Sequence, residues 1–321
     1  RDGVTAEEVK GILLGMASGQ ETLLGYFRRF IRNFEKRVGI NRTVGSLRAY
    51  SNAYSHIERF LQAQYKLSDI PFSALDRSFI DKYDLYLRTE RNLAPGTIIN
   101  LTVQLKTIVG EAIADGVITA SPFMGYEPVR PKHVQKYLTA EELHRIMTTP
   151  LHRQTLYHVR DMFLFSCFTG IPYGDMRLLT KDNLCLAEDG IWWIKSARQK
   201  TKIEFEIPLL DLPLQILKKY SGTAPGDKLL PMYCNSTLNL YLKEIARICH
   251  IDRPLVFHCS RHRYATEITL SHGVPLETVS RMLGHSQIET TQIYAKVTDE
   301  KIDADTKALN RKISERFSVV I

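Results

Sequence analysis

A helical pattern without any strand-like segment runs through the first third of this 321-residue chain. Between about Glu21 and Ile118, apolar residues recur at three- and four-residue spacing, the period of one face of an α-helix. Two examples are Leu24-Phe27-Phe30-Ile31-Phe34 and Tyr50-Tyr54-Ile57-Phe60-Leu61. A sheet would need a period of two, which this stretch lacks. The pattern therefore predicts an all-α domain of about four helices.

A proline-containing break separates this helical region from the rest of the chain. Residues 121–128 interrupt the helical period, and residues 129–136 carry two prolines bracketed by cations, which indicates a linker lying near phosphates. Thr139-Ala140-Glu141-Glu142 then has the spacing of a capping box, and Thr5-Ala6-Glu7-Glu8 has the same form. The expected organisation is an N-terminal segment at 1–20, a helical domain at 21–128, a linker at 129–137 and a second domain at 138–321.

The second domain is predicted to be mainly helical with a small antiparallel sheet. An apolar helix runs through Tyr157 to Phe168 and stops at Gly170. The apolar run 191–194 and the alternating run 203–207 flank a polar turn at 198–202, which is typical of a β-hairpin. Further helices are expected at about 211–220, 236–249, 259–272, 275–283, 288–296 and 298–313.

Composition excludes several classes of protein. With 44% hydrophobic and 24% charged residues the chain is globular, and no apolar stretch approaches the roughly 20 residues of a membrane helix. Five cysteines without a C-x-x-C pair indicate reduced thiols and a cytoplasmic protein. The net charge of +8 suits a polyanion-binding protein. The first domain's cations, read alone, indicate a solvated helix face: Arg28, Arg29, Arg32, Lys36, Arg37, Arg42, Arg48 and Lys106. The reactive residues further along the chain shift this interpretation toward contact with DNA.

Four reactive side chains lie at close intervals in the last third of the chain: His258, Arg261, His285 and Tyr294. A phosphodiester gains negative charge on its non-bridging oxygens during attack, so its site needs fixed cations, proton carriers and a nucleophile together. His258 and Arg261 share a helix face because they are three residues apart. The set predicts an enzyme that cuts DNA with a tyrosine.

Simpler interpretations exist for each of these residues. A helical tyrosine is usually a packed side chain, and a histidine is usually only hydrogen-bonded. His258 and His262 have the i, i+4 spacing of a zinc pair, but Cys259 stands where the metalloprotease motif has glutamate and Arg261 would repel a cation. We therefore expect neither a metal nor another cofactor.

Three short motifs resemble those of a known family. H-x-x-R-H-x-x-A-T from His258, L-G-H-S at 283–286 and T-T-Q-I-Y ending at Tyr294 are similar to the catalytic signature of the tyrosine recombinases, which include phage and conjugative-transposon integrases. The resemblance covers essentially the whole chain. It implies an all-α SAM-like core-binding domain and an α+β catalytic domain, forming a C-shaped clamp on double-stranded DNA. It also implies a nucleoid-associated homotetramer holding two DNA sites, with accessory bending or directionality proteins as partners.

The resemblance also implies a role for each matching residue. Tyr294 would attack the scissile phosphate to form a 3′-phosphotyrosyl bond, and Arg261 would hold non-bridging oxygens. His258 would assist proton transfer, and His285 would donate a hydrogen bond to the phosphate. Lys200, in the hairpin turn, would protonate the leaving 5′-oxygen.

One position departs from the family pattern. The family's first arginine follows the long helix, and Pro172 stands there in this chain. Arg198 is the expected replacement, because it lies two residues before Lys200 and strand periodicity would put both on one face. Arg177 is the competing donor, with a simple surface arginine as its alternative. Asp175 resembles a supporting carboxylate of the family.

Two other functions remain open at this point. A type IB topoisomerase shares much of this chemistry, and a catalytically impaired DNA-binding accessory protein would explain Pro172. The apolar end 316–321 is expected to dock on a neighbouring subunit or on its own domain. The segment 1–20 is expected to be a remnant or linker of an arm-binding domain.

Overall fold

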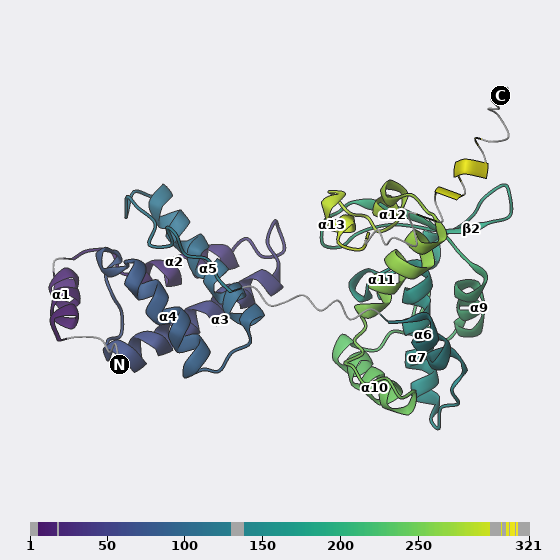
Figure 1. Cartoon of the computed structure of the whole chain (residues 1–321), viewed down its shortest axis with the longest axis horizontal. Coiled ribbons are helices and arrows are strands. Elements are labelled where there is room, and N and C mark those ends of the chain that lie inside the picture. Colours follow the sequence, from purple (N-terminus) through teal and green to yellow (C-terminus); the bar gives the residue numbers. More distant parts are fainter. Residues whose placement is uncertain are drawn as a thin grey trace, which may run out of the picture. The chain divides into compact units, whose positions relative to one another are not determined.

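The computed structural model describes residues 6–17, 19–129 and 138–295, and beyond these 303, 306, 307, 309–311 and 313. Contacts between residues divide the chain into two compact units, Arg1–Val134 and Gln135–Ile321 (Figure 1). Each unit has a hydrophobic core of its own. The structure confirms the predicted fold class, a mainly helical chain with a small antiparallel sheet.

Four long helices build the described part of the first unit: α2 (Leu23–Glu35), α3 (Val44–Phe60), α4 (Arg77–Thr89) and α5 (Pro95–Ala114). Local sequence explains where three of them begin. The Thr43 side chain caps α3 by accepting from Ser46 N–H, and the Asp76 side chain does the same for α4. Pro95 opens α5, where its missing N–H leaves no helical bond unmade. A shorter helix, α1 (Ala6–Ala17), precedes them.

The core of this unit is rich in aromatic rings. The fully buried ring of Phe60 has the rings of Phe79, Tyr83 and Tyr86 at centroid distances of 5.3, 5.1 and 5.3 Å. Burial of each such side chain stabilises the fold by about 1.5 to 3 kcal/mol. The three- and four-residue spacing in the sequence places these rings on inward helix faces.

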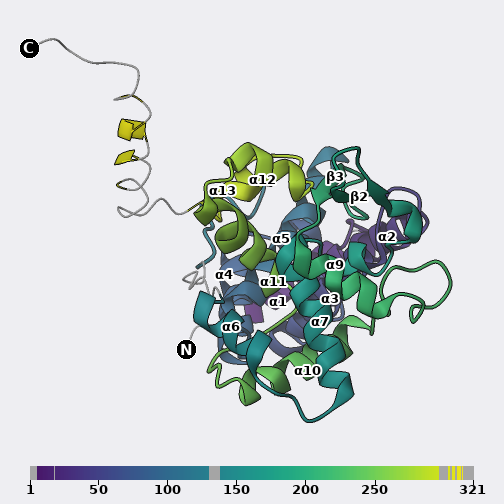
Figure 2. The ribbon, with the colours of Figure 1, turned by 90° about the vertical axis from the view of Figure 1, so that its right-hand side faces the viewer.

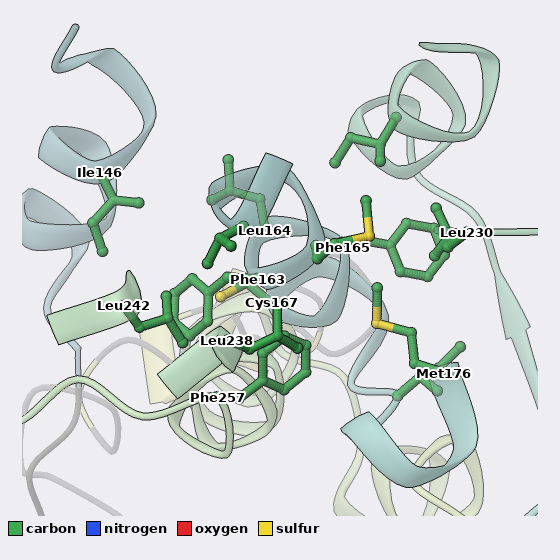
Figure 3. Packing of buried hydrophobic residues seen from close by; sticks show 14 of the residues in the cluster. Ile146, Phe163, Leu164, Phe165, Cys167, Met176, Leu230, Leu238, Leu242 and Phe257 are labelled. Atoms are coloured by element: carbon green, nitrogen blue, oxygen red, sulfur yellow. The ribbon is translucent and has the colours of Figure 1, made fainter. Parts of the chain in front are cut away.

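The second unit is built around one buried helix, α7 (Gln154–Thr169). The helices α9 (Asp211–Tyr220), α10 (Asn235–Ile248) and α11 (Cys259–Arg263) pack around it (Figure 2). Figure 3 shows Phe163 and Cys167 of α7 beside Leu238 and Leu242 of α10, all buried. The remaining short helices are α6 (Ala140–Thr148), α8 (Tyr173–Met176), α12 (Leu276–Met282) and α13 (Glu289–Gln292).

A small antiparallel sheet completes this unit, with strand order β1-β2-β3. The strands are β1 (Leu184–Leu186), β2 (Trp192–Ala197) and β3 (Glu204–Pro208). The predicted hairpin corresponds to β2 and β3, with Ile194 opposite Ile207 and both side chains buried. β1 was not predicted from the sequence, because three residues are too few to show a period.

The structure refines other predicted elements. The capping box at Thr139 is present, with Thr139 and Glu142 each bonding the other's backbone N–H. The helix expected at 259–272 changes type twice: α11 passes into a π-helix at Tyr264–Thr269 and a 3-10 turn at Leu270–His272. The cap at Thr5, the linker at 130–137 and the docking segment at 316–321 lie outside the described residues, as does most of 298–313.

The described helices include none that is long and apolar enough to cross a membrane. The predicted limits of the domains and the role of the segment 1–20 stay predictions.

Gly170, which ends α7, offers a test of packing against the π-helix that begins at Tyr264. Its φ is +69°, and a Cβ atom there would lie 2.4 Å from Cδ1 of the buried Tyr264 ring. We expect Gly170→Ala to lower the free energy of unfolding by about 1 to 2 kcal/mol for the left-handed backbone. Overpacking adds about 1 to 3 kcal/mol. Urea and thermal unfolding measure the total loss of unfolding free energy from these two effects.

Gly190→Ala is the matched control, because Gly190 has a φ of +82° but open space around its Cβ position. It should show only the backbone part of the loss. Equal losses in the two variants would contradict the clash with Tyr264.

Candidate active site

Arg261 is the buried centre of the site. It lies on α11, where Oγ of the neighbouring Ser260 is 2.6 Å from Oγ of Ser166 on α7. The Arg261 side chain donates from Nη1 to the Gly170 carbonyl at 2.8 Å and from Nη2 to the Leu283 carbonyl at 2.6 Å. These acceptors offset the loss of water around a side chain that is only 4% exposed.

The charge of Arg261 survives this burial. Desolvation, followed by the nearby positive charge of Arg198, lowers the pKa of Arg261 to about 10. Since this value lies well above neutral pH, the guanidinium stays protonated. Arg261 is therefore a fixed cation in a water-poor site, where charge interactions are strong.

His285 follows the turn at Gly284 and contacts Arg261 directly. Its Nε2 lies 2.8 Å from Arg261 Nη2, and its Nδ1 lies 2.7 Å from Thr291 Oγ1. Burial, and then the charges of Arg261 and Arg198, lower the pKa of His285 to about 4. The ring is therefore neutral at physiological pH.

Tyr294 is buried beside this pair, two residues beyond α13. Its ring lies 6.4 Å from that of His285 in a stacked arrangement and 5.0 Å from that of His262 edge to face. Burial raises the pKa of the Tyr294 phenol, while the charge of Arg261 and a hydrogen bond from it lower that pKa, as does the charge of Arg198. The nearby cations thus favour the phenolate that a nucleophile must become.

His258 lies at the N-terminal end of α11, one turn before His262. The two histidine rings are 4.9 Å apart, so His262 contacts both His258 and Tyr294. Desolvation, and then the charges of Arg261 and Arg198, lower the pKa of His258. A neutral imidazole can accept a proton, as a general base must.

Arg198 reaches the same place from the hairpin. Its Nη1 donates to the Leu283 carbonyl at 2.8 Å, the same oxygen that accepts from Arg261. Its Nε lies 2.5 Å from Oδ2 of the buried Asp175, whose Oδ1 accepts from Gln199 N–H at 2.8 Å. Asp175 therefore fixes both the Arg198 side chain and the start of the hairpin turn.

Arg198 and Lys200 do not lie on a strand, contrary to the prediction that strand periodicity puts them on one face. β2 ends at Ala197, so strand periodicity does not relate Arg198 to Lys200. Instead, Arg198 closes the turn, with its N–H donating to the Ile203 carbonyl and its carbonyl accepting from Lys202 N–H, both at 2.8 Å. As a result Arg198 points inward, whereas Lys200 is exposed.

The structure thus brings five of the six predicted site residues together: His258, Arg261, His285, Tyr294 and Arg198. Lys200 lies in the hairpin turn, and in the described part of the chain it has no hydrogen bond or ion pair with the other five. The rival Arg177 is exposed just beyond α8, whose first turn follows Pro172.

Two neighbours of the site were not recognised from the sequence. His262 was considered only as a zinc ligand, although its i, i+4 spacing from His258 already placed both rings on one helix face. Thr291 was part of the T-T-Q-I-Y motif, but nothing in a sequence shows that its hydroxyl meets His285.

Two models of protein families match this chain. A model of the phage integrase family matches residues 136–301, and a model of the phage integrase SAM-like domain matches residues 22–128. The chain belongs to the phage integrase family. The resemblance predicted from the three motifs is confirmed.

The curated relatives of this integrase are tyrosine recombinases. XerD of Listeria monocytogenes is 25% identical over 273 residues, which cover 80% of this chain and 89% of that protein. XerD of Pseudomonas putida is 30% identical over 152 residues, covering 43% and 49%. The integrase is accordingly a tyrosine-type site-specific recombinase.

Solved structures share the fold of the integrase. The Tn1549 transposon integrase in complex with transposon right end DNA superposes with a TM-score of 0.70 at 18% identity, covering 90% of this chain and 99% of that one. A lambda integrase dimer bound to a COC′ core site gives a TM-score of 0.70 at 18% identity, covering 87% and 100%.

The low pKa of His285 predicts how the stability of the integrase depends on pH. The folded-state pKa is about 4, against an ordinary value of 6.5, so between these values the unfolded chain binds more protons. Stability contributed by the neutral ring is present above pH 6.5 and is lost as pH falls toward 4. His285→Gln, which cannot take up the proton, should lose less stability over this interval. Urea midpoints at pH 6.5, 5.5 and 4.5 measure the difference, and an unchanged slope would contradict it.

Proposed function

We propose that Tyr294 is the nucleophile of this recombinase and that Arg198 and Arg261 together hold the scissile phosphate. The observation that carries the proposal is the convergence of both guanidinium groups on the Leu283 carbonyl, beside His285 and Tyr294. That oxygen occupies a position where two cations donate hydrogen bonds to one acceptor. A phosphate oxygen carries more negative charge than a carbonyl and is a stronger acceptor for both.

The cleavage step balances as a transesterification. The Tyr294 phenolic oxygen forms a bond to phosphorus, the bond from phosphorus to the 5′-oxygen breaks, and the product is a 3′-phosphotyrosyl link. His258 accepts the phenol proton, and Lys200 gives a proton to the leaving 5′-oxygen. The charge that develops on the non-bridging oxygens is met by the two arginines.

Rejoining repeats these steps in reverse with a new strand. The phosphotyrosyl bond conserves the energy of the broken phosphodiester, so a partner strand's 5′-hydroxyl can attack it without ATP. Lys200 then acts as the base and His258 as the acid. The same set of groups serves both directions, as the reversibility of the reaction requires.

His285 must change its hydrogen bond before it can donate to the phosphate. Its Nε2 faces a donor, Arg261 Nη2, and a phosphate oxygen is only an acceptor. When a phosphate oxygen accepts the hydrogen bond from Arg261, the negative charge of the phosphate counteracts the charges of Arg261 and Arg198. The pKa of His285, which these two charges lower, then rises. Nε2 then takes up a proton from solvent while Nδ1 keeps its own, and the resulting imidazolium donates a hydrogen bond from Nε2 to the phosphate oxygen.

The proposed substrate is double-stranded DNA at the ends of a mobile element. Support comes from the net charge of +8 and from the structural neighbours, which are a transposon integrase bound to transposon end DNA and a lambda integrase bound to its core site. The family resemblance further implies a homotetramer on two DNA sites as the active assembly. Accessory bending or directionality proteins would decide between integration and excision.

The nucleophile assignment has a direct test. A nicked cognate site traps the covalent intermediate, because the short fragment that carries the 5′-hydroxyl diffuses away. Wild type should give a protein–DNA band that survives denaturation, and Tyr294→Phe should give none while binding the same DNA. Equal bands from both proteins would show that another residue attacks. An absence of bands with the wild type on its cognate site would favour the accessory-protein alternative.

The two candidate arginines can be separated by a matched pair of variants. Arg198→Ala should lower the rate of covalent complex formation by about 10²- to 10³-fold, the usual effect of losing one donor to a developing oxyanion. Arg177→Ala removes an exposed side chain near α8 and should stay within a few-fold of wild type. The assay is the same nicked site under single-turnover conditions. A larger loss in Arg177→Ala than in Arg198→Ala would reverse the assignment.

A further inference from the structure

Thr291 connects the two rings of the active site. Its side chain is fully buried, and Oγ1 lies 2.7 Å from His285 Nδ1. Its carbonyl accepts from Tyr294 N–H at 2.9 Å, and its own N–H donates to the Ile288 carbonyl at 2.7 Å. One residue therefore holds the His285 ring with its side chain and the Tyr294 backbone with its carbonyl.

Donor and acceptor rules fix the arrangement of protons on His285. A guanidinium has only donors, so His285 Nε2 must be the acceptor in its 2.8 Å contact with Arg261. A neutral imidazole carries a single proton, which must then lie on Nδ1. The Thr291 hydroxyl oxygen is the acceptor for this Nδ1–H.

We propose that Thr291 is a positioning residue that keeps the proton of His285 on Nδ1, so that Nε2 always faces the phosphate. This inference rests on the proposed function, in which Nε2 meets the phosphate oxygen. The charged and titratable groups around the ring are Arg261, Arg198 and Tyr294. Arg261 contacts Nε2, and among the described residues Thr291 is the hydrogen-bond partner of Nδ1.

The test compares two substitutions at this position. Thr291→Val keeps the size of the side chain but removes the hydroxyl, whereas Thr291→Ser keeps the hydroxyl and removes a methyl group. On the nicked cognate site, Thr291→Val should form covalent complex roughly 10- to 100-fold more slowly, by analogy with the loss of a hydrogen-bond partner behind a metal-binding histidine. Thr291→Ser should stay within about threefold of wild type, and DNA affinity should be unchanged in both.

Thr290→Val is the matched control, because Thr290 is the exposed neighbour on α13. It should cleave at the wild-type rate. Equal slowing of Thr291→Val and Thr291→Ser would overturn the proposal, because it would assign the effect to packing rather than to the hydroxyl. Wild-type cleavage by Thr291→Val would also overturn it.

A second measurement is independent of catalysis. Nitrogen NMR of the protein labelled at its histidine rings, with His285→Gln to assign the signal, distinguishes a proton on Nδ1 from one on Nε2. Wild type without DNA should show the Nδ1–H form, and Thr291→Val should lose its predominance. A wild-type proton on Nε2 would overturn the proposal even if cleavage behaved as expected. Failure of the wild type to form covalent complex would instead count against the proposed function, and the NMR result would still decide this inference.

Discussion

Two positively charged side chains, Arg198 and Arg261, donate to one uncharged oxygen, the carbonyl of Leu283. Like charges held this close repel each other, and a carbonyl offsets that repulsion less well than an anion does. Asp175 supplies a counter-charge on the Arg198 side, whereas the described residues that accept hydrogen bonds from Arg261 are neutral. The site therefore holds two positive charges around one neutral oxygen, an arrangement that favours an anion at that place.

The backbone turns at Gly170 and Gly284 make this arrangement possible. Each presents a carbonyl at or next to a residue with positive φ, so that Arg261 finds acceptors from two distant segments. At Gly284 an added Cβ would lie 2.7 Å from Arg198 Cγ, so the absence of a side chain lets the Arg198 stem pass over the turn. The two glycines thus allow two arginines from different parts of the chain to lie close together.

Local patterns predicted most of the fold and the order of the reactive residues, and they failed where a contact joins distant segments. The aromatic spacing around Phe60 and the capping box at Thr139 are local signals, and both correspond to real elements. β1 forms because Leu184 pairs with Ile194, ten residues further along the chain. A strand of three residues shows no period from which this pairing could be predicted. Arg198 was selected for an incorrect reason, because its side chain is directed inward by the hairpin turn and its ion pair with Asp175 rather than by strand periodicity. The contact between Thr291 and His285 could not be predicted, because a hydrogen bond between two side chains produces no periodic pattern in the sequence.

The hairpin turn at residues 198–202 is a place where this enzyme can be inactivated. Arg198 closes the turn, Asp175 holds Gln199 N–H, and Lys200 follows directly. Under the proposed roles, one loop delivers both a phosphate-binding cation and the proton donor for the leaving group. If the first arginine followed the long helix instead, displacing the hairpin turn would remove the proton donor and leave that phosphate-binding cation in place. Here both functions depend on one turn. A partner that displaced this turn would therefore abolish phosphate binding by Arg198 and proton transfer by Lys200 together.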